Sequence, residues 1–300
     1  MKIQIYYNKN FIPFNLYIGS LYNILTTNNF FLSNNYEVSI IDNMSYYSQE
    51  TDYLILFLNY ISDVYNVDTK NTKIIFIHAD YIIYHSENDQ YLMCSYINEK
   101  NVNNTYVWEY NYLNIDIYEK NFINKKIHFI PLQYNSYLET IYNKYKLNIP
   151  HNEKPIDVLF LGAVDAGNRR DIILNEISKK YKLFSMYHVN DIDKYIHMIE
   201  QSKMVLHIYA RENNKSFDYY RLSLLYANKV LTISEKVENK HNLQELSGVM
   251  VETDYDNLVN TITDYLNKSD DEIANITNAT YEIFKKNDMD NHICDFFNNN

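Results

Sequence analysis

An acid and an arginine stand three residues apart in the segment SFDYYRLSLLYANK, where a predicted loop passes into a predicted helix at 217–227. Residues at this spacing share one face of a helix, so Asp218 can orient the guanidinium group of Arg221. That group can bind a phosphate through two parallel N–H donors, and Asp218 can also accept a hydrogen bond from a ribose hydroxyl. An exposed ion pair adds only about 0.2–0.5 kcal/mol to helix stability. We therefore predict a ligand site, with an ordinary surface ion pair as the alternative.

A glycine-containing turn, GAVDAGNRR, follows the predicted strand 157–162. Gly162 permits a close approach to the backbone, and Gly167 permits positive φ just before a helix whose free N–H groups could bind a phosphate. The turn lacks both the GxGxxG pattern and the Lys-Ser/Thr pair of a P-loop. Dinucleotide redox chemistry and P-loop hydrolysis are therefore disfavoured. A plain strand-to-helix turn is the alternative interpretation.

His207 and Tyr209 end the predicted strand 203–209, and Arg211 follows in the loop. Ligands in open α/β sheets bind at the carboxyl ends of the strands. We predict that these three side chains face a ligand. A buried structural histidine and a solvated loop arginine are equally good interpretations.

The amino-terminal half carries a second set of titratable residues in the segment FIHADYIIYH. His78, Asp80 and His85 fall at or just after a predicted strand. We expect His78 or Asp80 to serve as a general base, which must reach the proton that it removes. A loop histidine without a catalytic role is the alternative.

Neither the acid pair Asp191–Asp193 nor the cysteines predict a metal site. The acid pair directly precedes an apolar pattern of helical spacing, so we expect it to cap a helix start rather than hold a metal ion. Cys94 and Cys294 lie far apart and match no metal or redox spacing. We expect both thiols to be reduced.

The composition indicates a globular protein of two domains. The chain has 300 residues, of which 46% are hydrophobic and 22% charged. A formal net charge of −11 argues against nucleic-acid binding, which needs a basic face. No apolar run is long enough to span a membrane, and we find no signal peptide. The expectation is a cytoplasmic protein, or one of the host cytoplasm if the source is viral.

Two prolines, Pro150 and Pro155, bracket a polar segment that we take as the boundary between domains 1–150 and 151–300. Short apolar runs before this boundary predict strands of a parallel sheet covered on both faces. After it, strands and helices alternate, which predicts a doubly wound α/β domain. The predicted strands are 2–7, 37–41, 52–58, 73–78, 105–108, 126–131, 157–162, 182–187, 203–209, 229–234 and 248–252. The predicted helices are 20–31, 168–180, 191–201, 217–227, 241–246, 255–267 and 270–285.

The segments DVLFLGAVDAGNRRDIIL and KMVLHIYARENNKSFDYYRLSLLYANKVLTISE together resemble the donor-site half of GT-B-fold glycosyltransferases. The resemblance is closest to the group-1 or spore-maturation CgeB-like branch and covers residues 70–285. It is specific in the second domain and diffuse in the first. The strand of that branch often ends in Asn-x-His, where this chain has His207 and Tyr209, and its usual glutamate is replaced by Asp218.

The resemblance implies an α/β fold of two Rossmann-like domains with mostly parallel sheets facing across a cleft. It implies acceptor binding in the first domain and nucleotide-sugar binding in the second, without a metal ion or other cofactor. By position, the implied contacts to the diphosphate or ribose are Gly162, Arg169 or Arg170, Asp218 and Arg221. The implied contacts to the base or sugar are Ser234, Glu235 and Lys236.

These observations predict a glycosyltransferase that moves a sugar, such as that of a UDP-sugar, from a nucleoside diphosphate to a glycan or other small acceptor. A non-catalytic relative that binds a nucleotide or glycan is the main alternative. A nucleotide-sugar epimerase with the same fold is a third interpretation. The sequence assigns no oligomeric state.

Overall fold

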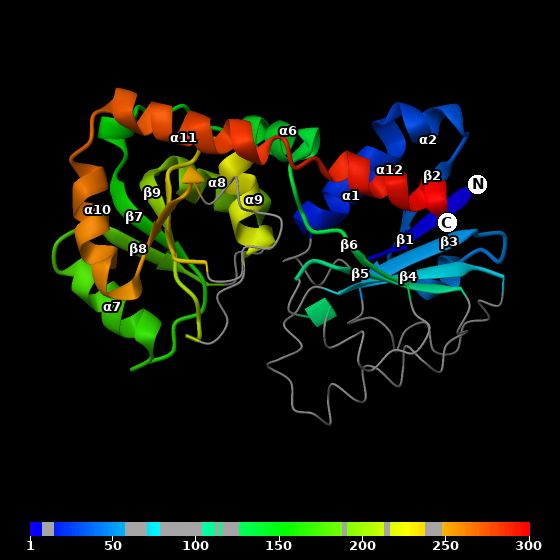
Figure 1. Ribbon diagram of the computed structural model, residues 1–300, viewed down its shortest axis with the longest axis horizontal. Coiled ribbons are helices and arrows are strands. Elements are labelled where there is room, and N and C mark those ends of the chain that lie inside the picture. Colours follow the sequence, from blue (N-terminus) through cyan, green and yellow to red (C-terminus); the bar gives the residue numbers. More distant parts are fainter. Residues whose placement is uncertain are drawn as a thin grey trace. The chain divides into compact units, whose positions relative to one another are not determined.

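The computed structural model describes residues 1–7, 15–57, 71–78, 104–111, 114–115, 126–187, 191–212, 217–237 and 248–300. The chain forms two compact units (Figure 1). The first unit comprises Met1–Leu132 and Asp288–Asn300, and the second comprises Gln133–Asn287. This division differs from the expected boundary at residue 150, because residues 133–150 group with the second unit and the end of the chain groups with the first.

The first unit is built on a six-stranded parallel sheet of order β2-β1-β3-β4-β5-β6. Every residue of β3 and β5 is buried, as expected for strands that are covered on both faces. All six strands were predicted from their apolar runs, and their ends agree within two residues. The strands are β1 (Lys2–Tyr6), β2 (Glu37–Ile41), β3 (Tyr53–Phe57), β4 (Lys73–His78), β5 (Thr105–Glu109) and β6 (Lys126–Phe129).

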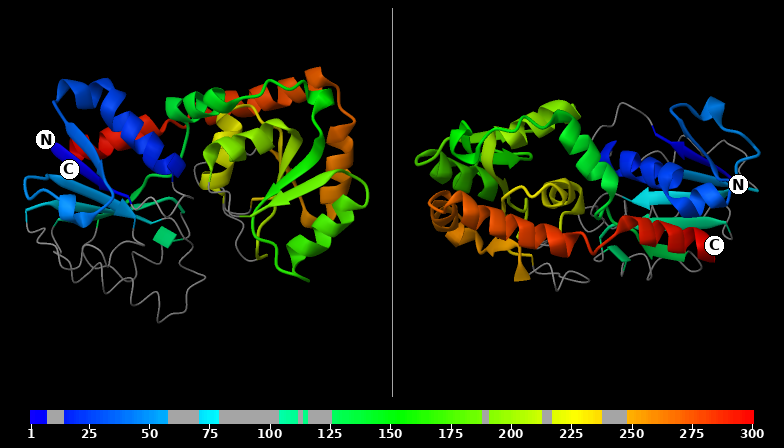
Figure 2. Two further views of the ribbon diagram at one scale, coloured as in Figure 1. Left: turned by 180° about the vertical axis from the view of Figure 1, so that it is seen from behind. Right: turned by 90° about the horizontal axis from the view of Figure 1, so that it is seen from above.

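The described helices of this unit are α1 (Asn15–Thr27), α2 (Asn29–Ser33), the short 3-10 helix η2 (Met44–Tyr46) and α12 (Met289–Asn299). The predicted helix 20–31 is in fact two helices, because Asn28 accepts a hydrogen bond from the Phe30 amide at 2.9 Å and so starts a new helix. Both α1 and α12 lie over one face of the sheet (Figure 2).

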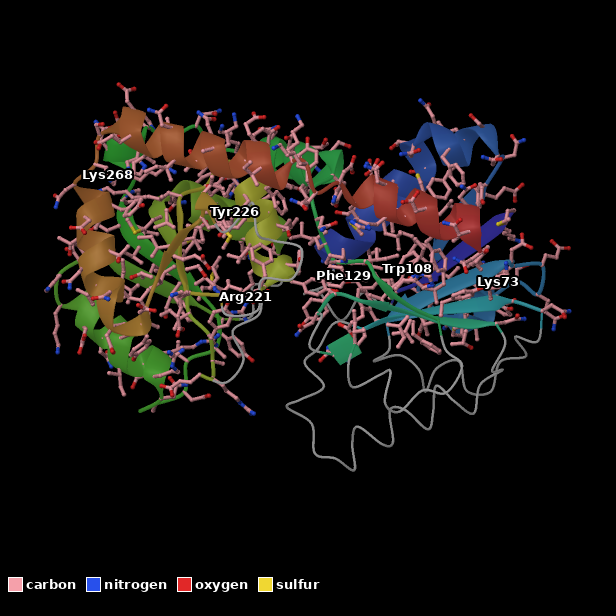
Figure 3. The ribbon with its side chains drawn as sticks, viewed as in Figure 1. Lys73, Trp108, Phe129, Arg221, Tyr226 and Lys268 are labelled. Atoms are coloured by element: carbon pink, nitrogen blue, oxygen red, sulfur yellow. The ribbon has the colours of Figure 1, made fainter. Side chains whose placement is uncertain are left out.

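Helix α12 was not predicted, yet it completes the core of the first unit. The Phe296 ring packs edge-on against Trp108, with ring centroids 5.1 Å apart. The Phe297 ring packs in the same way against Tyr53 at 4.9 Å and Phe31 at 5.4 Å. Trp108, labelled in Figure 3, is fully buried beneath this helix. Such edge-to-face pairs add stabilisation beyond the burial of their area.

The second unit contains a five-stranded parallel sheet of order β11-β10-β9-β7-β8. Its strands are β7 (Ile156–Leu161), β8 (Leu183–Met186), β9 (Ser202–His207), β10 (Thr232–Glu235) and β11 (Val251–Thr253). Its helices are α6 (Ser136–Tyr145), η5 (His151–Glu153), α7 (Arg169–Ser178), α8 (Ile192–Glu200), α9 (Tyr219–Ala227), η7 (Tyr255–Asn257), α10 (Leu258–Leu266) and α11 (Asp270–Phe284).

The predicted alternation of strands and helices in this unit is confirmed. Helices α7 and α10 lie on one side of the sheet and α8 and α9 on the other (Figure 1). Two details differ, because helix α6 was not predicted and the strand expected from residue 248 starts only at Val251. The helix expected at 241–246 lies outside the described residues and stays a prediction.

Among the described residues, no helix combines the length and the apolar character that crossing a membrane requires.

Candidate functional site

Three neighbouring strands of the second unit end at the same edge of the sheet, here called the carboxyl edge. Strand β9 lies between β7 and β10, and Ser234 is the register partner of His207. Helices α7 and α9 begin after β7 and β9, so their amino termini follow this edge. Figure 3 shows Arg221 in the first turn of α9. The topology thus brings together residues that are up to 73 positions apart, from Gly162 to Glu235.

Asp218 is the N-cap of α9 and also holds Arg221. Its Oδ1 atom accepts a hydrogen bond from the Arg221 amide at 3.2 Å, and its Oδ2 atom lies 3.3 Å from Arg221 Nε. The side chain of Asp218 is 15% exposed and that of Arg221 is 39% exposed. One carboxylate therefore fixes both the helix start and the direction of the guanidinium group, as the sequence pattern predicted.

His207 connects this pair to strand β10. Its Nε2 atom lies 3.5 Å from Asp218 Oδ2, and its Nδ1 atom lies 3.1 Å from Ser234 Oγ. Burial lowers the pKa of His207, and this effect outweighs the neighbouring Asp218, which would raise it. The lowered pKa favours a neutral imidazole at pH 7. Burial raises the pKa of Asp218, but Arg221 and then His207 outweigh this effect and hold it below its usual range. The Asp218 carboxylate therefore stays ionised.

The series Ser234, His207 and Asp218 does not have the properties of a hydrolase triad. Ser234 is fully buried, and its hydroxyl donates a hydrogen bond to the Glu235 carbonyl at 2.8 Å. A nucleophilic serine must instead be able to reach a substrate carbonyl. Ser234 and His207 instead hold the side chain of Asp218 in place, because His207 contacts both. The Tyr209 ring also packs edge-on against His207, with centroids 4.8 Å apart.

Arg169 forms a two-pronged ion pair with Glu235. Nη1 donates to Oε2 at 2.7 Å and Nη2 donates to Oε1 at 2.6 Å. Nη1 also donates to the Tyr209 carbonyl at 2.8 Å, and the guanidinium carbon lies 4.3 Å from the ring centroid of Tyr255. The bond to Glu235 raises the pKa of Arg169. Tyr255 could not be identified from the sequence, because the contact joins residues 86 positions apart.

Arg170 is also bound to protein groups. Its Nε and Nη2 atoms donate to the Ile208 carbonyl at 3.0 and 2.7 Å, and Nη1 donates to the Ala163 carbonyl at 3.1 Å. These bonds hold the loop after β7 against the end of β9. Arg169 and Arg170, the candidate phosphate ligands of the GAVDAGNRR turn, thus both form hydrogen bonds to protein groups that hold the site together in this structure.

Gly162 lies close to the guanidinium group of Arg221. A Cβ atom at Gly162 would meet Phe160 Cζ at 3.1 Å and Arg221 Nη1 at 3.5 Å. Gly167 has φ of +77°, as predicted from its position before the helix. The amino terminus of α7 is capped from within the chain, because Asp171 N donates to Asn168 Oδ1 at 2.9 Å and Gly167 N donates to Asp171 Oδ2 at 2.8 Å. Two of the N–H groups expected for a phosphate are therefore already engaged.

Two further predicted residues are exposed at this edge. Arg211 lies in the loop after β9, and Lys236 follows β10, where its amide donates to the Thr253 carbonyl at 2.9 Å. All four arginines of the chain fall between residues 169 and 221. All arginines of the protein therefore lie in the segments that follow strands β7 and β9 at the carboxyl edge of the second sheet.

The acid pair and the cysteines have the following positions. Asp191 occupies the N-cap of α8, as predicted, but its side chain makes no capping hydrogen bond and instead lies 3.5 Å from Lys194 Nζ. Within the described parts of the chain, no group of three or more His, Cys, Asp and Glu side chains could hold a metal ion. Cys294 is a free thiol, and Cys94 falls outside the described residues.

A second polar cluster lies at the carboxyl edge of the first sheet. His78 ends β4 and is the register partner of Glu109, which ends β5. His78 Nδ1 lies 2.7 Å from Glu109 Oε2. The other carboxylate oxygen, Oε1, accepts hydrogen bonds from the amides of Tyr110 and Asn111 at 2.9 Å each. His78 and Glu109 are buried, and Asp80 and His85 fall outside the described residues.

Glu109 was missed at the sequence level. Its only signal was an acid that ends an apolar strand candidate, and the pairing with His78 depends on the register of two strands whose paired residues are 31 positions apart.

Comparison with known proteins places the fold. No family model matches the chain. A segment of 129 residues is 29% identical to an uncharacterised protein of Acanthamoeba polyphaga mimivirus, covering 42% of this chain and 45% of that protein. The match therefore spans less than half the length of that relative.

Among solved structures, the β-glucosyltransferase of phage T4 is 14% identical over 99% of this chain and 98% of its own, with a TM-score of 0.60. Sucrose-phosphate synthase of Thermosynechococcus elongatus is 10% identical over 100% and 98%, with a TM-score of 0.57. A putative UDP-N-acetylglucosamine 2-epimerase of Listeria monocytogenes is 9% identical over 97% and 94%, with a TM-score of 0.56. At these identities the likeness concerns the fold, and this chain has the α/β architecture of GT-B proteins, with two parallel sheets covered by helices.

Proposed function

We propose that this protein is a glycosyltransferase that binds a nucleoside-diphosphate sugar at the carboxyl edge of its second sheet. The sugar passes to a hydroxyl group of an acceptor bound by the first unit, without a bound metal ion or other cofactor. The motif resemblance favours the group-1 or CgeB-like branch. We further propose a UDP-sugar donor and action in the cytoplasm, which is that of the host if the protein is viral.

The observation that carries this proposal is the arrangement of Arg221 over Gly162. Arg221 Nη1 lies 3.5 Å from the place that a Cβ atom of Gly162 would take, so the absence of a side chain there lets the guanidinium group lie close to the backbone at the end of β7. A guanidinium group can bind a phosphate through two parallel N–H donors. Asp218 and His207 fix the direction of that group. The GT-B fold adds to this, since the T4 β-glucosyltransferase is described with the substrate uridine diphosphoglucose and the Listeria protein as a putative UDP-N-acetylglucosamine 2-epimerase.

The proposed chemistry is displacement at the anomeric carbon. The acceptor oxygen forms a bond to that carbon, and the bond to the diphosphate breaks, so negative charge develops on the diphosphate. Arg221 stabilises the departing charge, which is the kind of preorganised electrostatic assistance that gives the largest single contribution in many enzymes. Because Asp218 is ionised, Arg221 stays oriented in the absence of a ligand.

The charge of the first unit supports a neutral acceptor. Residues 1–132 and 288–300 contain eight lysines, no arginine and sixteen acidic residues. A polyanion such as DNA needs a basic surface, because its binding rests on neutralised phosphates. We therefore propose a glycan or another small hydroxyl compound, although one solved structure of a similar fold is described as a DNA-modifying β-glucosyltransferase.

A calorimetric titration with UDP, GDP, TDP and their common sugars tests the donor site. One nucleotide class should bind the wild type, and Arg221→Ala should weaken its binding about 10- to 100-fold, as expected for the loss of a charge-assisted bond of roughly 1.5–3 kcal/mol. The matched control is Lys203→Ala. Lys203 lies at the opposite edge of the same sheet, 2.7 Å from Asp157, and its loss should leave the affinity unchanged.

A non-catalytic nucleotide- or glycan-binding relative is the second candidate. The specific observation in its favour is that Arg169 and Arg170 bind protein groups rather than leaving two cations for a diphosphate. Binding without release of the nucleoside diphosphate would support this candidate. An isomerised donor would support an epimerase instead, and the absence of any nucleotide binding would contradict the donor site itself.

A further inference from the structure

One oxygen of the Asp218 carboxylate lies between a histidine and an arginine. Its Oδ2 atom is 3.5 Å from His207 Nε2 and 3.3 Å from Arg221 Nε. We propose that His207 is a positioning residue of the donor site, and that binding of a diphosphate at Arg221 is coupled to the uptake of one proton by His207 Nε2. This inference rests on the proposed function. It deepens that proposal by naming the residue through which pH controls the affinity for the donor.

The hydrogen bonds of Ser234 indicate which ring nitrogen of His207 carries the proton. The single hydroxyl proton of Ser234 is donated to the Glu235 carbonyl at 2.8 Å, because a carbonyl oxygen can only accept. His207 Nδ1 lies 3.1 Å from the same Oγ atom and must therefore donate to it. In the neutral ring the lone pair then lies on Nε2, on the side of Asp218.

The neutral ring therefore directs a lone pair at a carboxylate. His207 is 4% exposed and Asp218 is 15% exposed, so water screens this contact only weakly. A proton on Nε2 would convert the contact into a charge-assisted hydrogen bond. Ser234 and Asp218 are the polar partners of the ring in the described part of the second unit. The neutral ring thus lacks one of the two hydrogen bonds that an imidazolium would donate.

Burial and two arginines keep this proton off His207 in the free protein. Burial lowers the pKa of His207 most, Asp218 opposes this effect, and Arg221 and Arg170 add to it. Arg170 is held by bonds to two main-chain carbonyls, so its effect does not depend on a ligand. Arg221 is 39% exposed, so a phosphate can reach it and offset its effect.

The neighbouring elements carry titratable groups of other types. On α8, burial raises the pKa of Tyr195 to about 12, so its hydroxyl stays neutral. Glu235 and Arg169 form an ion pair between β10 and α7, and Arg211 and Glu212 are exposed on the loop after β9 with opposite charges. Of these residue types and histidine, imidazole alone ordinarily titrates between about pH 5.5 and 7.5. A change in affinity over this range is therefore the signature of a histidine.

A phosphate at Arg221 changes the partner of Asp218 Oδ2. The phosphate oxygens accept bonds from the guanidinium group, and their negative charge offsets the effect of Arg221 on His207. Both contacts of Oδ2 are longer than the distance of about 2.7–2.9 Å in charge-assisted bonds, so this oxygen can move from one partner to the other. A proton from the solvent then adds to His207 Nε2, which donates to Oδ2. Asp218 is thereby held in place while Arg221 binds the ligand.

Calorimetry of the wild type measures the proton uptake without any substitution. The probes are UDP-glucose, GDP-mannose and TDP-glucose, because both phosphates of a nucleotide sugar are esterified and lack the second pKa of about 6 that a terminal phosphate has. The binding enthalpy is compared in PIPES and imidazole buffers, whose heats of ionisation differ. We expect uptake of roughly 0.3–1 proton at about pH 6.5, and a Kd that falls about 3- to 30-fold from pH 7.5 to 5.5.

Two-bond ¹H–¹⁵N correlation spectra identify the group that takes up the proton. The free protein should show the neutral Nδ1–H tautomer of His207, and saturating nucleotide sugar should protonate both ring nitrogens. The spectrum of His207→Gln identifies this signal among the nine histidines. A free protein with the Nε2–H tautomer would overturn the proposal, because Asp218 would then already receive its bond.

Two substitutions of His207 separate its positioning role from its charge. In His207→Gln the amide can donate to Asp218 without taking up a proton, so binding should persist with a Kd that changes less than about twofold over the same pH range. His207→Leu has no donor and should weaken binding about 10-fold. His197→Gln is the matched control. His197 lies in the last turn of α8, which ends directly before β9 begins and thus far from the carboxyl edge, so proton uptake should equal that of the wild type.

The outcomes separate this inference from the proposed function. Binding without proton uptake, uptake that persists in His207→Gln, or wild-type affinity in His207→Leu would overturn the inference while leaving the donor site. The absence of binding by all three nucleotide sugars would contradict the donor site and the inference together. Uptake that is lost in His207→Gln and kept in His197→Gln would support the proposal.

Discussion

Arg169 and Glu235 face each other in parallel, with two N–H···O bonds of 2.6 and 2.7 Å between the end of β10 and the start of α7. The glutamate is fully buried and the arginine side chain is 13% exposed. Because the same arginine also donates to the Tyr209 carbonyl, this pair joins three segments of the second unit. Its two parallel charge-assisted bonds fix the orientation of both side chains.

Removing one partner of this pair should destabilise the second unit. Arg169→Met leaves a buried carboxylate without its counter-charge, and we expect a loss of about 3–5 kcal/mol in the free energy of unfolding. Urea unfolding followed by circular dichroism measures the change. The double variant Arg169→Met/Glu235→Leu should recover most of it, because the uncompensated charge is gone. A single variant that loses less than about 1 kcal/mol would contradict this role.

The buried His207 should make stability depend on pH in a defined direction. Its pKa is lowered in the folded state, so below the unfolded value of roughly 6.5 the unfolded chain binds more protons and stability falls as pH falls. Unfolding midpoints in urea between pH 7.5 and 5 should show this slope, and His207→Gln should flatten it. The slopes are to be compared rather than the absolute values, because the substitution also removes the contact to Asp218. An unchanged slope would contradict the neutral buried state.

Two glycines near the site should respond differently to alanine. At Gly162 a Cβ atom meets Phe160 and Arg221, so Gly162→Ala should weaken nucleotide binding by displacing the guanidinium group. At Gly167 there is open space but φ is +77°. Gly167→Ala should therefore cost roughly 1–2 kcal/mol of stability and leave the affinity of the folded protein nearly unchanged. Calorimetry and thermal unfolding of both variants check this contrast, and equal effects on binding would contradict it.

The aromatic contacts of α12 should be essential to the first unit. Phe297 packs against Phe31, Tyr36 and Tyr53, and Phe297→Ala should cost about 3–5 kcal/mol through lost burial and the remaining cavity. Trp108 fluorescence reports this directly, since it is the one tryptophan of the chain and is fully buried. The exposed Tyr22→Ala is the control and should shift the midpoint little.

Most of the strands could be predicted because their apolar runs are short, buried on both faces and separated by polar segments. The end of the chain was harder. The segment MDNHICDFFNNN is rich in Asp and Asn. Its two phenylalanines can be recognised as core residues only from their packing against Trp108 and Tyr53, which lie far away in the sequence. The same lack of local signal explains why the unit boundary was placed at residue 150 rather than 132.

The same distinction applies to the candidate site, where contacts between neighbours in sequence could be predicted and contacts between distant residues could not. Asp218 and Arg221 were found because their contact lies within one helical turn. The partners of Arg169 and Arg170 are 66 and 38 positions away, so the sequence could not indicate that protein groups bind these guanidinium groups. Glu109 needed the register of two strands to become visible as the partner of His78.

The assignment of residues 288–300 to the first unit has a consequence for biosynthesis. The second unit is a continuous segment, Gln133–Asn287, and its contacts are complete once that segment has left the ribosome. The first unit cannot bury Trp108 and Tyr53 until Phe296 and Phe297 have been translated. While the second unit is being synthesised, the apolar surface of the first sheet that α12 later covers therefore stays exposed to chaperones and to aggregation. The second unit, although it begins later in the chain, can thus complete its contacts before the first unit does.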